Sequence, residues 1–226
     1  MTEFAGQPQA VVFDLDGTLV DTADEFVVVL QQMLADYDRP KLDAKQIRKT
    51  VSNGSGALIT LGFGVTPTDN DYEHLRLVFL DRYAQVLGST AKPYPGMQSL
   101  VARLAEADIP WGVATNKFRR YAEPLMTAMN FKPATASLVT PCDVTHAKPH
   151  PEAILLSCAN LGSDPGRTIY IGDHQRDIDA GRSAGCFTIA AAYGYIEDHD
   201  DPNSWQADAI AHSSEDLATM ITRMMI

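Results

Sequence analysis

The chain has 226 residues, of which 45% are hydrophobic, and its 18 basic and 29 acidic side chains give a formal net charge of −11. This length exceeds one average domain of roughly 150 residues, and it allows a core that needs neither disulfides nor a structural metal. The acidity argues against a protein that binds nucleic-acid phosphates through a basic face. A small anionic substrate stays possible, because a bound metal ion or a few local donors can reverse the field inside a cleft.

The three cysteines are few and unpatterned, which predicts reduced thiols. Residues 1–10 lack the basic and apolar regions of a secretory signal, and no run of 18 apolar residues suggests a membrane span. We therefore expect a cytoplasmic protein without a membrane or nucleic-acid partner. A monomer or a weak homodimer is expected.

The first structural signal is an apolar, β-branched run from Ala10 to Phe13 that ends in the polar segment Asp14–Thr18. This pattern is typical of a buried strand followed by a turn. From Thr22 to about Leu87 apolar residues recur at helical spacing, so this block predicts helices and no strand. Within it, the breaker cluster Ser52–Gly56 is expected to open a helix.

After residue 92 strand and helix signals alternate, which predicts right-handed βαβ units. The expected strands are 111–114, 137–139, 168–171, 187–190 and 209–211, and the expected helices are 97–107, 121–129, 151–161, 176–184 and 214–224. The predicted fold class is α/β, a Rossmann-like and mostly parallel sheet with helices on both faces. Because residues 22–91 are too long for a loop, we expect them to form an inserted all-helical cap domain, with 1–21 and 92–226 forming the core.

Polar side chains follow four of the expected strands, where ligands of open α/β sheets bind. Grouped carboxylates repel one another unless a cation lies between them, and their hard oxygens suit Mg²⁺. A hydroxyl and an ammonium beside them suit an anionic oxygen. These side chains are Asp14, Asp16, Thr115, Asn116, Lys148, Asp173 and Asp177.

Taken singly, each of these residues fits an ordinary structural role. Asp16–Gly17 fits a turn, Thr115–Asn116 a helix cap, Lys148 a surface lysine, and Asp177 a first-turn helix acid. Their joint placement is what favours a site. The histidines without metal-ligand partners at a suitable spacing, which we expect to be loop residues, are His146, His150 and His199.

Four segments resemble, in order and spacing, the motifs of the haloacid dehalogenase-like superfamily. The resemblance covers nearly the whole chain, including a helical cap inserted after the first motif. It implies a Mg²⁺-dependent phosphatase acting on a small-molecule phosphate ester. The four segments are Asp14–Asp21, Gly112–Asn116, Lys148–Pro149 and Gly172–Asp177.

The resemblance also implies roles for the matching residues. Asp14 would be the nucleophile that forms an aspartyl-phosphate, and Asp16 would be the general acid and then the base. Asp14, the backbone carbonyl of Asp16, and Asp173 would hold Mg²⁺. Thr115 and Lys148 would bind the phosphoryl oxygens.

Two further residues would support the residues that contact the substrate and the metal. Asn116 and Asp177 would act from a second layer, with Asp177 supporting the metal or orienting Lys148. His174 departs from the family pattern, since some relatives place a second acid there. Asp16 favours phosphoester chemistry, because dehalogenase members typically lack this acid.

Substrate recognition is expected from the cap. The segment beginning Ser52, Asn53 and Gly54 could present backbone N–H groups to an anion, although an ordinary helix start accounts for it equally well. The side chains expected to meet a substrate carboxylate are Arg48, Lys117 and Arg120.

Within the superfamily the chain is similar to the phosphoglycolate phosphatase branch. Residues 192–196 and 202–208 resemble phosphatases of bacterial cell-wall recycling that act on N-acetylmuramic acid 6-phosphate. We therefore expect that ester to be the substrate, with 2-phosphoglycolate as the alternative. A phosphosugar mutase and a non-enzymatic phospho-switch are further alternatives, and the cap and Asp16 argue against the switch.

Overall fold

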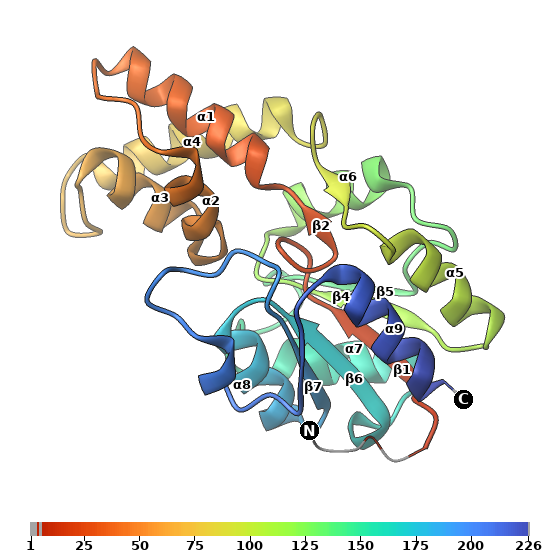
Figure 1. Ribbon diagram of the computed structural model, residues 1–226. Coiled ribbons are helices and arrows are strands. Elements are labelled where there is room, and N and C mark those ends of the chain that lie inside the picture. Colours follow the sequence, from red (N-terminus) through yellow and green to blue (C-terminus); the bar gives the residue numbers. More distant parts are fainter. Residues whose placement is uncertain (1–3, 5, 226) are drawn as a thin grey trace.

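The computed structural model describes residue 4 and residues 6–225 (Figure 1). Its centre is a six-stranded sheet with the order β5-β4-β1-β6-β7-β8, in which every neighbouring pair is parallel. The predicted Rossmann-like α/β fold is therefore confirmed. The strands are β1 Ala10–Phe13, β4 Trp111–Ala114, β5 Ser137–Val139, β6 Thr168–Gly172, β7 Phe187–Ala191 and β8 Ala209–Ala211.

Helices cover both faces of this sheet, which is why its strands are continuous apolar runs. Alternate residues of β1 point to opposite sides: Val11 and Phe13 pack in one apolar cluster and Val12 in another. The first cluster includes residues of α5, α6 and α9, and the second includes residues of α7 and α8. These helices are α5 Met97–Glu106, α6 Arg119–Met129, α7 Glu152–Leu161, α8 Gln175–Ala184 and α9 Ser214–Met224.

Four α-helices fall within residues 22–87 and gather at one end of the sheet (Figure 1). Their apolar faces form a cluster of their own, centred on residues such as Leu30 and Phe79. No strand interrupts residues 22–87, as the helical spacing predicted. The helices are α1 Ala23–Asp36, α2 Ala44–Thr50, α3 Gly54–Phe63 and α4 Tyr72–Val86.

The two chain segments that lead into and out of these helices form a small antiparallel ribbon. Its strands are β2 Val20–Asp21 and β3 Lys92–Pro93, with Val20 opposite Pro93 and Asp21 opposite Lys92. The sequence did not reveal this ribbon, because two residues show no periodicity. None of the helices in the described part of the chain has the length and apolar character needed to span a membrane.

The apolar cluster of α1 to α4 makes a stability prediction. Replacing the fully buried Leu30 by alanine should lower the free energy of unfolding by about 2–5 kcal/mol, because it leaves a cavity. Val28, on the same helix, is 42% exposed, and Val28→Ala should change it by less than about 0.5 kcal/mol. Urea denaturation followed by circular dichroism measures both, and equal losses would contradict the packing described.

Candidate active site

The site begins where β1 ends, at the centre of the sheet. The Asp14 amide still donates to the carbonyl of Ile171 at 2.8 Å, so the aspartate leaves the sheet from a fixed position. The chain then turns at Gly17, whose φ of +80° lies in the left-handed region that favours glycine. A β-carbon at Gly17 would also lie 2.1 Å from Oδ2 of Asp173. The turn can therefore approach Asp173 only with glycine at this position.

Asp173 follows β6 and lies with two other acids in a buried cluster. Carboxylate oxygens of Asp14, Asp173 and Asp177 lie within 4.8 Å of one another. Burial raises the pKa of Asp14 from 3.8 to about 6, against the opposing attraction of Lys148, and raises the pKa of Asp173 to about 8. The protein thus holds Asp14 and Asp173 where their charged forms are disfavoured without a cation.

One buried ammonium compensates part of this charge. Lys148 Nζ lies 2.7 Å from Asp14 and 2.6 Å from Asp177, and its side chain is 1% exposed. It also donates to the carbonyl of Ala114 and to the Tyr170 hydroxyl, each at 2.9 Å. The geometry therefore links Lys148 directly to Asp177.

The acid cluster fits a divalent metal ion. Oδ2 of Asp173 accepts hydrogen bonds from the Ser52 hydroxyl and the Tyr195 amide, both at 2.9 Å. Its other oxygen, Oδ1, is buried without a hydrogen-bond partner among the described residues. Such an atom is costly to bury unless something binds it. Together with oxygens of Asp14 and Asp177, Oδ1 offers the hard donors that Mg²⁺ prefers.

Residues after β4 hold the loop that carries Lys148. The side-chain amide of Asn116 donates to the Lys148 carbonyl at 3.0 Å, and its oxygen accepts from the Lys148 amide at 3.1 Å. Thr115 is buried beside it, and its hydroxyl oxygen accepts from the Lys117 amide. The Asn116 side chain thus contacts Lys148 through its backbone amide and carbonyl.

Asp16 faces the helical block. Its Oδ1 accepts from the Thr22 hydroxyl at 2.6 Å and from the Lys117 ammonium at 2.9 Å. The same ammonium donates to the Tyr83 hydroxyl at 2.7 Å and lies over the rings of Phe26 and Tyr83. Lys117 therefore ties Asp16 to helices α1 and α4, a contact that the sequence had not suggested.

A cavity of about 470 Å³ lies between this edge of the sheet and the helices. It brings together every residue that the sequence placed at the strand ends, and it includes the whole segment Ser52–Gly56 at the start of α3. The predicted residues that line it are Asp14, Asp16, Thr115, Asn116, Lys148, Asp173, Asp177, Ser52, Asn53, Gly54 and Lys117.

Two predicted substrate residues do not line this cavity. The Arg48 guanidinium pairs with Asp21 at 2.7 Å and with Asp24 at 2.5 Å, which holds it at the base of α1. Arg120 instead lies over the ring of Tyr121, at 4.7 Å from its centroid.

Two other arginines take their place in the cavity wall. Arg76 comes from α4 and pairs with Glu73, and Arg176 donates to the Ser52 carbonyl at 2.8 Å. Sequence reasoning missed both, because an arginine on an amphipathic helix usually faces solvent. Tyr170 was missed for the opposite reason, since an aromatic residue in a buried strand predicts core packing.

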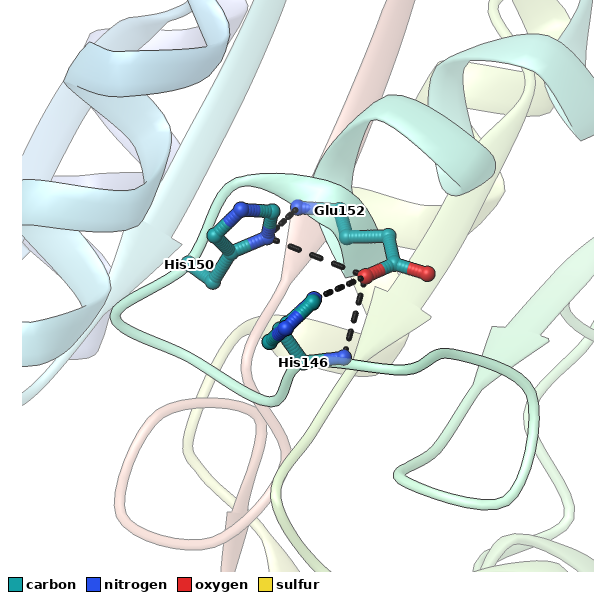
Figure 2. A group of neighbouring side chains, drawn as sticks. All are labelled: His146, His150 and Glu152. Atoms are coloured by element: carbon teal, nitrogen blue, oxygen red, sulfur yellow. Dashed lines mark hydrogen bonds and ion pairs between the residues drawn. The ribbon is translucent and has the colours of Figure 1, made fainter.

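A second group of potential metal ligands lies outside the cavity. His146 and His150, expected to be loop residues without partners, lie beside Glu152 with one ligand atom of each residue within 4.8 Å of the others (Figure 2). The expectation that they lack partners is wrong, because the loop folds back onto the first turn of α7.

Comparison with known proteins identifies the class that this fold and site define. The site consists of buried acids and a lysine at the carboxyl edge of a parallel sheet, the edge where ligands of open α/β sheets bind. The model of the haloacid dehalogenase-like hydrolases matches residues 11–191, and the chain belongs to this family. The family predicted from the sequence motifs is thus confirmed.

Several relatives carry the name of a phosphatase. The chain is 42% identical over 217 residues to the N-acetylmuramic acid 6-phosphate phosphatase of Pseudomonas aeruginosa, with 96% of each chain covered. It is 35% identical over 210 residues to a phosphoglycolate phosphatase of Xanthomonas campestris, covering 93% of this chain and 95% of the relative. A crystal structure of a predicted phosphoglycolate phosphatase from Haemophilus somnus shares the fold, with a TM-score of 0.83, 24% identity and coverage of 95% and 98%.

The raised pKa values predict how pH affects the metal-free protein. Asp14 and Asp173 bind protons more tightly folded than unfolded, so stability should fall as pH rises from their ordinary value of 3.8 through about 6 and about 8. Thermal melts without divalent cations should show this decline, and Asp173→Asn should flatten its upper part. Equal pH dependence of the two proteins between about 6 and 8 would contradict the burial argument.

Proposed function

We propose that the protein is a Mg²⁺-dependent phosphomonoester hydrolase that acts through an aspartyl-phosphate on Asp14. The observation that carries this proposal is the placement of Asp14 in the cavity, held by Lys148 at 2.7 Å, with Asp16 lining the same cavity beside Thr22 and Lys117. The phosphatases among the relatives support the same class of reaction.

Asp14 attacks phosphorus with one carboxylate oxygen while Lys148 holds the other. Asp16 gives a proton to the departing alcohol and then takes one from the water that hydrolyses the aspartyl-phosphate. The Thr22 hydroxyl and the Lys117 ammonium orient the Asp16 carboxylate for these transfers. Both steps need an acid placed at the boundary between the sheet and the helices, where Asp16 lies.

The transferred phosphoryl group needs positive charge more than any covalent help. Lys148 supplies one charge and the Thr115 hydroxyl one donor from the cavity wall. Asp14, Asp173 and the Asp16 carbonyl would hold Mg²⁺, with Asp177 beside them. When bound, Mg²⁺ would neutralise the charge of the phosphoryl oxygens. Asp177 also orients Lys148 through their 2.6 Å contact.

We further propose that residues 22–91 form a cap that selects N-acetylmuramic acid 6-phosphate. The cavity of about 470 Å³ has the size of typical small-ligand sites, and a two-carbon acid such as 2-phosphoglycolate would leave much of it to water. Arg76, on the cap side, offers a charge to the substrate carboxylate. Relatives with this activity at 40–42% identity support the choice.

The last part of the proposal concerns the partners, the cellular location and the oligomeric state of the protein. The substrate is a small sugar phosphate, and the net charge of −11 disfavours nucleic acid as a partner. We propose that the protein works in the cytoplasm as a monomer or weak homodimer.

Phosphate release from a substrate panel tests the substrate assignment. With Mg²⁺ present, kcat/KM should be highest for N-acetylmuramic acid 6-phosphate and lower for 2-phosphoglycolate, hexose phosphates and nucleotides. A preference for 2-phosphoglycolate would overturn the cell-wall substrate and leave the reaction type in place. Absence of phosphate release from every ester would overturn the proposed function itself.

The nucleophile is tested by Asp14→Asn, which keeps the shape of the side chain and removes its charge. This change should lower kcat by at least about 10³-fold, because no oxygen of comparable nucleophilicity replaces the carboxylate. Intact-mass measurement after acid quenching should detect the phosphorylated wild type and no phosphorylated variant. Unchanged turnover of the variant would exclude Asp14 as the nucleophile.

The role of Arg76 is tested against Arg48. Arg76→Ala should raise KM for the carboxylated substrate by about tenfold or more and leave kcat nearly unchanged, because it removes binding without touching the reacting atoms. Arg48→Ala should have a smaller effect on KM, because Arg48 lies outside the cavity and pairs with Asp21 and Asp24. A larger effect from Arg48 would reverse this assignment.

A further inference from the structure

The loop between β5 and α7 has two chemically different faces. Lys148 turns inward, and its side chain is 1% exposed against Asp14 and Asp177. His146 and His150, two residues before and after it, turn outward with side chains 62% and 51% exposed. Figure 2 shows both imidazoles directed toward Glu152, in the first turn of α7. The outward face plays no part in the proposed hydrolysis.

The three outward side chains converge on one point. Oε2 of Glu152 lies 3.1 Å from Nδ1 of His146 and 3.8 Å from Nδ1 of His150. The two ring centroids are 4.6 Å apart, with an angle of 41° between the planes. One ligand atom from each residue lies within 4.8 Å of the other two, so small side-chain rotations are enough to place all three around one ion.

The backbone prepares the carboxylate for this position. The amides of Thr145 and His146 donate to the two oxygens of Glu152 at 2.8 and 2.9 Å. These two bonds fix the carboxylate against the loop. The Glu152 side chain is therefore already ordered in the folded protein, so a cation that binds it costs less conformational entropy.

We propose that His146, His150 and Glu152 form a second metal site, which takes a borderline divalent transition cation such as Zn²⁺. Two imidazoles and one carboxylate are a common protein ligand set for zinc, with a fourth position for water. Mg²⁺ prefers an all-oxygen shell, so the two sites differ in selectivity. The exposure of both histidines gives the cation and its water direct access from solvent.

A cation at this site would join the two ends of the segment that carries Lys148. Asn116 already fixes the middle of that segment through the backbone amide and carbonyl of Lys148. Zinc would therefore restrict residues 145–152 from the outside, while leaving the inward contacts of Lys148 in place. This inference depends on the outward cluster alone and does not require the proposed hydrolase activity.

Isothermal titration of the metal-free protein with Zn²⁺, in the presence of excess Mg²⁺ to occupy the acid cluster, tests the proposal. The wild type should bind one Zn²⁺ that a His146→Ala/His150→Ala variant binds at least about tenfold more weakly. Glu152→Gln should also weaken this binding. The matched control is His199→Ala, which removes another exposed histidine that lies 3.7 Å from a glutamate and should leave the affinity unchanged.

Two further measurements separate this site from the acid cluster. Asp14→Asn should keep the Zn²⁺ site. Hydrogen exchange of residues 145–152 should slow when Zn²⁺ is added to the wild type, and it should not slow in the double histidine variant. Phosphate release with Mg²⁺ should be unchanged in the double histidine variant. The proposal is overturned if the wild type binds no Zn²⁺ under excess Mg²⁺, if the histidine variant binds it equally well, or if only Asp14→Asn removes it.

Discussion

The structure depends on keeping three carboxylates buried around a single ammonium. Asp14, Asp173 and Asp177 meet at the carboxyl edge of the sheet, and Lys148 touches two of them. Taking charges out of water is unfavourable unless partners replace the lost solvent. The sheet therefore maintains a local excess of negative charge that a cation would relieve, and a phosphate ester could then approach an otherwise acidic surface. For the same reason, the overall charge of −11 does not conflict with an anionic substrate.

The acid cluster also depends on two glycines, because no larger residue could approach Asp173 as closely. Gly17 and Gly194 approach Asp173 from two different loops, and a β-carbon on Gly194 would lie 2.2 Å from that of Asp173. Tyr195, the next residue, donates its amide to Asp173 and its hydroxyl to Asp21, while that hydroxyl accepts from the amides of Thr22 and Ala23. One residue thus contacts both the acid cluster and the first turn of α1. The proposed cap and the acids are mechanically connected.

The fold was predictable from the sequence because strand and helix each leave a regular trace. The strands β4, β5 and β8 match the expected ranges, since a short apolar run between polar turns is the usual mark of a buried strand. The strand-end rule located the carboxylates and Lys148 without any tertiary information. Placing these residues required only the order of the strands and helices, which the hydrophobic periodicity indicates.

The features that depend on where a side chain points could not be predicted from the sequence. Whether Arg48 or Arg76 faces the cavity is decided by ion pairs with Asp21 and Glu73, and no spacing rule encodes them. The cluster of His146, His150 and Glu152 exists because a loop folds back on a helix, and a separation of a few residues in sequence does not show that the chain reverses there. Local sequence patterns were therefore enough to predict the sheet and its helices. The residues that line the cavity depend on long-range contacts, which these patterns do not show.

The position of β1 has a consequence for how the chain acquires this structure. Val11 pairs with Trp111 and Ala10 with Thr168, so the central strand has no partner close to it in sequence. During synthesis the helices of residues 23–86 can pack on one another before β4 or β6 has been made. The sheet can form only after β4 and β6 have been made, and loop closure over such sequence separations slows its formation. The proposed nucleophile at the end of β1 is thus translated before the strands that flank it, and it can reach its native surroundings only after they have been made.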